Sequence, residues 1–147
     1  MPYSIKQLTQ ILTLVGALSA AALTGLPAQA QNKGDDTLLE MQQAFRKNDK
    51  TRLSALLPQA RGHALEPLAA FWELRPRLDT APESEILGFL SRYAGTYYED
   101  RLRADWLLQL GKRRDWATFS AQYPLYRMRD DREVRCYNLA IEAMNSK

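Results

Sequence analysis

The chain has 147 residues and a formal net charge of +3, with 20 Lys and Arg and 17 Asp and Glu interspersed along it. So small a net charge excludes a protein that binds nucleic acid mainly by electrostatic attraction. The single cysteine, Cys136, excludes an internal disulfide, and with the single histidine, His63, it leaves too few ligands for a zinc site. We expect Cys136 to be a small buried residue and His63, between two helices, to be a surface or capping residue.

The first 30 residues are typical of a secretory signal. Lys6 is followed by a long uncharged run, and the small residues Ala28 and Ala30 fit the rule for signal cleavage, which predicts a mature chain from Gln31. The alternative is a membrane anchor, because the run approaches the ~20 apolar residues that span a bilayer. Polar and small residues dilute the run, so we favour a cleaved signal, a periplasmic protein and no stable membrane anchor.

The rest of the chain, 31–147, is predicted to be one all-α domain because a short motif recurs in it. An Asp that can cap a helix, an apolar residue four positions later and a helix-ending Pro occur at 49–58 and again at 115–124, 66 residues apart. A looser copy lies at 82–93. Two units of roughly 30 to 36 residues fit this spacing, which predicts antiparallel helical hairpins stacked as an α-solenoid.

About seven helices are expected from the apolar periodicity and the breakers between the periodic segments. The first begins after Asp36 and the second directly after Asp49, and a connection this short makes the two helices neighbours. Pro76 is expected to kink the third helix or to end it near Arg75, because proline removes a helical hydrogen bond. The expected helices are 37–47, 49–58, 66–75, 82–93, 96–111, 115–124 and 134–144.

The fifth and seventh helices carry the clearest end signals. Thr96 and Glu99 have the spacing of a capping box, in which each side chain bonds the backbone of the other, and Gly111 is expected to end that helix. Glu99 and Arg103, at helical pairing distance, are expected on a solvated face. Since stacked repeats need a polar terminal face, we expect the array to be truncated in mid-repeat after the seventh helix. Its apolar positions have no later helix to cover them: Val134, Tyr137, Ile141 and Met144.

No catalytic residue is predicted. Two pairs of carboxylates lie close enough in sequence to be considered for glycoside hydrolysis: Glu83 with Glu85, and Glu99 with Asp100. Both pairs lie in first helical turns, where capping and the helix dipole already explain acidic residues. The glycines are isolated and form no phosphate-binding loop, so no cofactor is expected. Aromatic residues at helical spacing are expected in the core, and Trp116, just after a capping Asp, is the candidate to contact a glycan or a partner.

Several short motifs follow one another through the chain in a fixed order. They are Leu65-Glu66-Pro67-Leu68, Arg77-Leu78-Asp79, Arg92-Tyr93-Ala94-Gly95-Thr96, Asp100-Arg101-Leu102-Arg103, Trp106-Leu107, the Gly-Lys-Arg-Arg-Asp-Trp run ending at Trp116, and Cys136-Tyr137. This series resembles the N-terminal superhelical region of the periplasmic soluble lytic murein transglycosylases. The resemblance implies a U-shaped or ring-shaped array of helical hairpins. It also implies a following lysozyme-like domain whose glutamate cleaves between N-acetylmuramic acid and N-acetylglucosamine without hydrolysis, giving 1,6-anhydromuramyl products.

The resemblance implies that this chain is the non-catalytic N-terminal scaffold segment of such an enzyme. The glutamate-serine and glycine-leucine-methionine-glutamine motifs of the lysozyme-like domain are not found in the sequence, so no catalytic residue is carried over. Peptidoglycan glycan strands and the missing C-terminal domain are then the expected partners. The alternative hypothesis is a free-standing periplasmic helical-repeat adaptor that binds a protein along a concave face.

Overall fold

The computed structural model describes residues 28–146, with side chains from Gly34 onward. Within these residues the chain forms seven α-helices and three short 3-10 helices and no strand, which confirms the predicted all-α class. The helices are α1 (Ala28–Arg46), α2 (Lys50–Leu56), η1 (Leu57–Ala60), α3 (Glu66–Leu74), η2 (Arg75–Arg77), α4 (Glu83–Arg92), α5 (Tyr97–Arg113), α6 (Trp116–Gln122), η3 (Tyr123–Leu125) and α7 (Arg132–Asn145).

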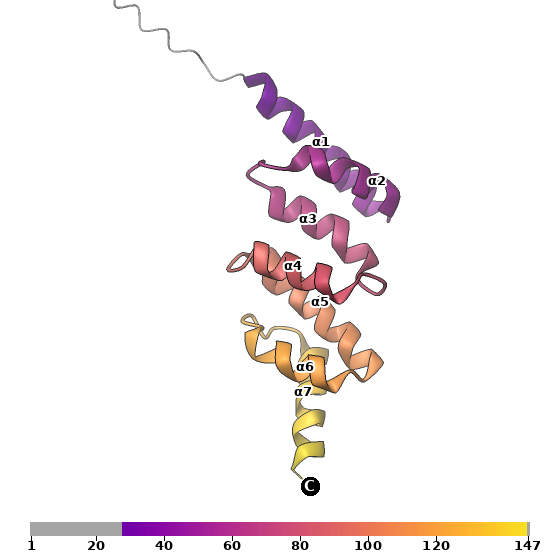
Figure 1. Ribbon diagram of the computed structural model, residues 1–147, viewed down its shortest axis with the longest axis vertical. Helices are drawn as coiled ribbons and strands as arrows, with labels where there is room; N and C mark the ends of the chain where they lie inside the picture. The colour runs from indigo at the N-terminus through magenta and orange to yellow at the C-terminus, as the bar shows by residue number, and fades with distance from the viewer. Residues whose placement is uncertain (1–27, 147) are drawn as a thin grey trace, which may run out of the picture.

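The helices follow one another in chain order along the long axis of the molecule, from α1 at one end to α7 at the other (Figure 1). Most contacts join elements that are close in sequence: α1 packs on α2 and α3, α3 and α4 pack on α5, and α5 packs on α6 and α7. The core therefore consists of two apolar clusters, a smaller one within α1 to α3 and a larger one that runs from α3 to α7. Leu57 and Trp72 pack against both clusters and join them.

The two copies of the sequence motif begin with the same helix cap. Asp49 caps α2 by accepting a hydrogen bond from the backbone N–H of Arg52 (2.9 Å). Asp115 caps α6 in the same way, with the N–H of Thr118 as donor (3.2 Å). Each carboxylate satisfies one of the backbone donors that the first helical turn leaves without a partner. The capping role predicted for both residues is confirmed.

The turn that leads into each cap is also the same. Asn48 and Arg114 have φ values of 54° and 59°, in the left-handed region that ends the preceding helix. The backbone N–H of the next residue, Asp49 or Asp115, then donates to a carbonyl five residues earlier, at 2.9 Å and 3.0 Å respectively. The backbone turn is thus shared by two segments whose side chains differ.

Each occurrence of the sequence motif ends in a 3-10 helix that contains a proline, Pro58 in η1 and Pro124 in η3. The apolar residues that the motif predicts to be buried, Leu53 and Phe119, have no solvent-exposed surface. The next helices, α3 and α7, begin at 66 and 132, so the 66-residue spacing continues beyond the motif. We call α1 to α3 the first copy and α5 to α7 the second copy.

The first helix is longer than predicted. It begins at Ala28, so Asp36 lies inside α1 and is not its cap. Gly34 lies inside α1 without ending the helix. The ring of His63 packs against the helix at this position, and a Cβ at Gly34 would lie 2.8 Å from Cδ2 of that ring. The imidazole also bonds Asp35 of the same turn, with 2.9 Å between Nε2 and Oδ1.

The predicted signal peptide falls almost entirely outside the described residues, which begin at Ala28. Signal cleavage after Ala30, before Gln31, therefore stays a prediction, and so does export of the chain. In the described part of the chain, every helix is too short or too polar to cross a bilayer.

Pro76 ends an α-helix as predicted. The regular part of α3 stops at Leu74, and the chain continues through Pro76 as the 3-10 helix η2. Proline has no N–H to donate and its ring crowds the preceding turn, so the looser 3-10 geometry takes over. The backbone N–H of Leu78 closes this turn on the carbonyl of Arg75 (3.3 Å).

Gly111 does not end α5, which is where the prediction was wrong. The helix runs on to Arg113, and Arg114 in the left-handed conformation ends it. A glycine is required at 111 for packing, because a Cβ there would lie 2.4 Å from ring carbon Cδ2 of Tyr137. The Tyr137 ring of α7 therefore packs directly on the backbone of α5 at Gly111.

Cys136 was predicted to be buried, and it is exposed. The face of α7 that packs on the rest of the chain contains Val134 and Ile141, both buried. Cys136 lies two residues from Val134, which places it about 200° around the helix, on the opposite side. Met144, also expected on the apolar stripe, is 51% exposed.

Candidate functional site

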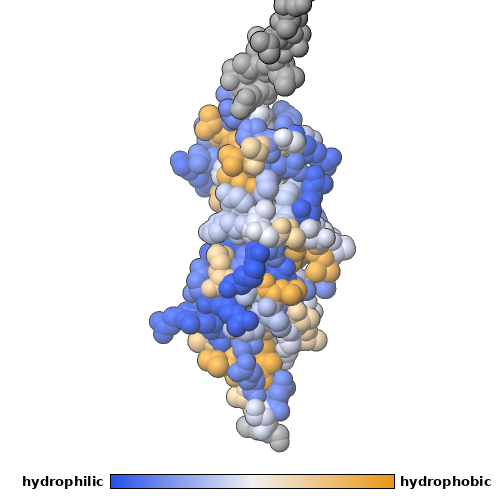
Figure 2. All heavy atoms as spheres, turned by 90° about the vertical axis from the view of Figure 1, so that its left-hand side faces the viewer, coloured by the Kyte–Doolittle hydropathy of each residue, from blue (hydrophilic) through white to orange (hydrophobic). Residues whose placement is uncertain are grey.

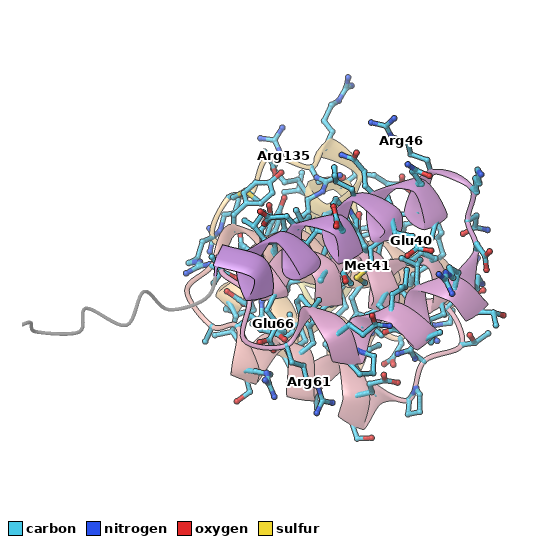
Figure 3. The ribbon with its side chains drawn as sticks, turned by 90° about the horizontal axis from the view of Figure 1, so that it is seen from above. Glu40, Met41, Arg46, Arg61, Glu66 and Arg135 are labelled. Carbon is cyan, nitrogen blue, oxygen red and sulfur yellow. The ribbon has the colours of Figure 1, made fainter. Side chains whose placement is uncertain are left out.

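A groove of about 300 Å³ lies between η1, α3 and α4. Charged side chains from α3, α4 and the residue after η1 reach it, with Arg61 and Glu66 on one wall and Arg92 on the other. Figure 3 labels Arg61 and Glu66 close together, seen along the stack. The ring of Tyr93 and the exposed backbone at Gly88 complete the groove, and no atom lies within 4 Å of where a Cβ at Gly88 would stand.

Glu66, the first residue of α3, is held by three donors. The backbone N–H of Gly62 donates to Oε2 (2.7 Å), and the guanidinium of Arg92 (2.8 Å) and the hydroxyl of Tyr93 (2.9 Å) donate to Oε1. The Gly62 N–H is the largest cause that holds the pKa of Glu66 below its usual value, with Tyr93 and Arg92 adding to it against the effect of burial. Glu66 is therefore an ionised hydrogen-bond acceptor near neutral pH.

A second carboxylate in the groove, Glu85, is paired with Arg77, which also binds Glu73. Arg77 donates to Oε1 and Oε2 of Glu73 (2.8 and 2.7 Å) and to Oε2 of Glu85 (2.7 Å). The hydrogen bond from Arg77 lowers the pKa of Glu85. Ser54 of α2 donates to Glu73 as well (2.7 Å), so this arginine ties α3 to α4 and its partner Glu73 ties α3 to α2.

These carboxylates are suited to binding and not to acid catalysis. A general acid that cleaves a glycoside needs a raised pKa, whereas the pKa values of Glu66 and Glu85 are both lowered. The groove does offer ionised acceptors next to the guanidinium donors of Arg61 and Arg92, with the Tyr93 ring between them. Closely spaced donors and acceptors beside an aromatic ring suit a neutral ligand rich in hydroxyl groups.

A second depression, of about 390 Å³, lies between η2 and α5, and its Arg75 and Asp105 bind each other. Arg75 donates to Asp105 of α5 (2.7 Å), and its guanidinium lies over the rings of Phe45 and Phe71 at 6.0 and 5.7 Å from their centroids. This arginine therefore seals the edge of the core between the two apolar clusters.

The acidic residues at the start of α5 are buried, which corrects the prediction of a solvated face. Glu99, Asp100 and Arg103 are each less than 8% exposed. The loop between α6 and α7 folds over them: the carboxylate of Asp100 accepts the backbone N–H groups of Arg127 and Met128, both at 2.8 Å. Asp100 thus fixes the loop to α5, and nothing in this arrangement leaves it free to act as an acid or base.

Only half of the predicted capping box forms. The hydroxyl of Thr96 accepts the N–H of Glu99 (3.2 Å), as predicted. The Glu99 carboxylate does not return to the backbone of Thr96, because Arg103 (3.1 Å) and Arg127 (2.8 Å) donate to it. In the described residues every buried side-chain nitrogen and oxygen has a hydrogen-bond partner. The second proposed pair, Glu83 with Glu85, is also not a pair, since Glu83 is exposed and Glu85 binds Arg77.

The remaining candidate residues lie away from the groove. Trp116 is half-buried at the start of α6, where its ring packs on that of Tyr137 with 6.2 Å between centroids. His63 accepts the backbone N–H of Leu65 on Nδ1 (3.0 Å) and bonds Asp35 through Nε2, so it holds the turn before α3, although α3 itself has no side-chain cap. Arg77, named above only within the motif Arg77-Leu78-Asp79, and Arg127 were not predicted to bind these carboxylates. The four-residue spacing from Glu73 to Arg77 was the one available signal.

Residues 28–146 contain no cluster of three or more His, Cys, Asp or Glu side chains that could hold a metal ion. Comparison of the chain with protein-family models, with curated proteins and with solved structures finds no match. What the chain does must therefore be inferred from its own geometry and motifs.

Proposed function

We propose that this chain is a non-catalytic scaffold segment of a periplasmic soluble lytic murein transglycosylase, built as an α-solenoid of antiparallel helical hairpins. Two features support the solenoid: the turns at Asp49 and Asp115 are the same, and the helices succeed one another along one axis (Figure 1). Local contacts between successive elements are the pattern of stacked repeats.

The motifs that carry the resemblance have structural roles at these positions. Glu66 binds Arg92 and Tyr93 of the motif Arg92-Tyr93-Ala94-Gly95-Thr96, which joins two of the motifs in space. Asp100 anchors the loop before α7, and Gly95 has the positive φ of 85° that ends α4. Residues that determine the fold are the ones a related scaffold would need to share, which supports the family assignment.

The observation that carries the functional proposal is the groove around Glu66 and Glu85, with ionised carboxylates and guanidinium groups and no general acid. We infer that it contacts the sugar hydroxyls of a peptidoglycan strand, while a lysozyme-like domain supplies the catalytic glutamate. Charge-assisted hydrogen bonds to several hydroxyls give orientation at modest affinity, as a strand that must slide requires.

Co-sedimentation with purified, insoluble murein tests this role, and Gly88 offers a matched pair of variants. Gly88→Gln places a side chain in the groove, and Gly88→Ala adds only a methyl group into open space. We expect the wild-type protein and Gly88→Ala to sediment with murein equally, and Gly88→Gln to lose most of its binding while keeping the same helical circular dichroism. Equal binding by all three proteins would show that the groove does not bind murein.

A second measurement separates scaffold from enzyme. The purified protein should leave the turbidity of a murein suspension unchanged, and measurable lysis would show that the chain is catalytic. If the protein neither binds nor lyses murein, the alternative of a periplasmic helical-repeat adaptor for a protein partner becomes the better hypothesis.

A further inference from the structure

The outer face of α7 is apolar and uncovered, although the equivalent face in the first copy is buried. Ala70, Leu74 and Leu78, in and after α3, are buried under α4 and α5. The residues 66 positions later form the same stripe on α7 and are all exposed: Cys136, Ala140 and Met144. The repeat therefore places a surface built for helix packing where no other described element covers it.

Large side chains extend this stripe along α7. Leu139 is 62% exposed and Met144 is 51% exposed, and Ala143 lies one turn after Leu139 on the same side. In Figure 1 the C-terminal part of α7 projects beyond α6 at the end of the stack, and Figure 2 shows hydrophobic spheres close to this end. Small residues between two large ones let another helix approach closely.

The charges beside the stripe indicate the orientation of the helix that fits it. Arg132, Glu133 and Arg135 lie in the first half of α7, a net charge of +1, and within the described chain none of them makes an ion pair. Arg135 lies at the edge of the molecule in Figure 3. Among the described residues, the Glu142 carboxylate in the second half bonds only the amide of Asn138 (2.7 Å). An antiparallel copy of α7 would bring each basic half against an acidic half.

We propose that two copies of this chain associate through their α7 helices, antiparallel, with Arg135 and the partner's Glu142 two residues apart along the helix pair, about 3 Å, within reach of the long arginine side chain. The two-fold axis passes between Leu139 and Ala140, so that Cys136 faces the partner's Ala143. The first helix offers a poor alternative surface for α7, because its outward side carries the charged Asp36 and Glu40. The same patch used by both copies is the arrangement expected of a two-fold dimer.

The expected dimer is weak. α7 has 14 residues, about 21 Å of helix, and such a contact is smaller than the ~1,200 Å² that stable complexes bury. In this register the two Cys136 residues are seven positions apart along the helix pair, about 10 Å, which is too far for a disulfide. The native protein should therefore dimerise with increasing concentration without forming a cross-link.

Ala143→Cys tests the register directly. In the proposed dimer the new cysteine faces the partner's Cys136, and oxidised glutathione should convert most of the protein into a disulfide-linked dimer. A bond within one chain is excluded, since 136 and 143 are two turns apart on one helix. Ser120→Cys, on an exposed face of α6, is the control and should stay monomeric on a non-reducing gel.

Leu139→Glu added to Ala143→Cys should abolish the cross-link while circular dichroism shows a folded chain. Ready cross-linking of the native protein through Cys136 alone would overturn the antiparallel register. Failure of folded Ala143→Cys to cross-link at a concentration where it should pair would overturn the dimer.

Charge reversal gives an independent test by analytical ultracentrifugation at low salt. Arg135→Glu and Glu142→Arg should each raise the dimer Kd by about fivefold, because each places two like-charged pairs at the interface. The double reversal restores opposite charges and should return the Kd to near the native value. A native protein that stays monomeric at every concentration, or a double variant no better than the singles, would contradict the proposal.

Discussion

The first and second copies of the repeat share a backbone turn and fill it with different side chains. In the first copy Phe45, near the end of α1, stacks on Trp72 of α3 with 6.0 Å between ring centroids. The equivalent position in α5 is Gly111, and the space is taken by Tyr137 of α7. Tyr137 corresponds to Phe71, which is aromatic in the first copy as well, so the second copy lacks the ring of Phe45 and fills its place with the ring that α7 supplies. The cap and the left-handed residue thus fix the turn, and packing adapts to it.

The loops that follow η1 and η3 show a second difference. In the second copy the buried Asp100 holds two backbone N–H groups of the loop. The residue 66 positions earlier is Gly34, and there the loop is held by His63 on Asp35 and by Gly62 on Glu66. One loop therefore depends on a buried charge and the other on partly exposed contacts.

The largest expected effect comes from removing the buried charge. Asp100→Ala leaves two backbone donors without their acceptor and removes an ion-pair partner 3.6 Å from Arg127 Nε, and we expect a loss of about 3 to 5 kcal/mol in the free energy of unfolding. Asp35→Ala, which removes the exposed acceptor of the first copy, should cost less than about 1 kcal/mol. Urea titration followed by circular dichroism measures both. Similar losses would mean that the two loops are held alike.

The next effect concerns the contact of the Tyr137 ring with Gly111. Gly111→Ala should destabilise by about 1 to 3 kcal/mol, because the methyl group meets the Tyr137 ring, although alanine is the better helix former. Gly88→Ala, in open space on α4, should stabilise by about 0.5 to 1 kcal/mol. Adding Tyr137→Ala to Gly111→Ala should cost less than the sum of the single losses. Additive losses would show that the ring does not rest on Gly111.

The shared caps should give equal and smaller effects. Asp49→Ala and Asp115→Ala each remove one cap hydrogen bond, and we expect about 1 kcal/mol from either, equal within about 0.5 kcal/mol. The matching Asp→Asn variants should retain most of the stability, because the amide oxygen still accepts. Thermal melts of the four variants are sufficient. A large difference between the two alanine variants would contradict the structural equivalence of the turns.

The smallest effect is a dependence on pH that arises at Glu66, in the first copy. The pKa of Glu66 is lowered in the folded state, chiefly by the Gly62 N–H, so its contribution is present above about pH 4.5, the value for a free glutamate, and is lost as the pH falls through the folded pKa. Glu66→Gln should reduce stability at pH 7 and flatten its fall below pH 4.5. An unchanged pH profile in this variant would contradict the assigned hydrogen bonds.

The parts of the fold that could be predicted are those determined within one helical turn. Asp49, Asp115 and Thr96 cap helices because the acceptor and its N–H lie three residues apart, and Pro76 ends α3 by its own geometry. These are local properties, and periodicity likewise places Leu53 and other apolar residues in the core. The order of the helices follows from such local signals.

The parts that were missed depend on residues far apart in sequence. Gly111 meets Tyr137 and Asp100 meets the loop at Arg127, 26 and 27 positions later, and no local pattern distinguishes such a glycine from a helix end or such an aspartate from a solvated one. The groove has the same origin, because Glu66 and Tyr93 come from different helices. For this reason the candidate site could not be predicted, while the helices around it could.

Because the two turns are equivalent, the 66 residues between them could be deleted while one complete turn is kept. A chain that ran from Asp49 directly into Trp116 would keep a left-handed residue, an aspartate cap and a proline-containing ending, and it would be shorter by one 66-residue module. Packing sets the condition for such a deletion. Phe45 would then stand where Gly111 makes room for Tyr137, so it would have to become glycine before α1 could take the place of α5.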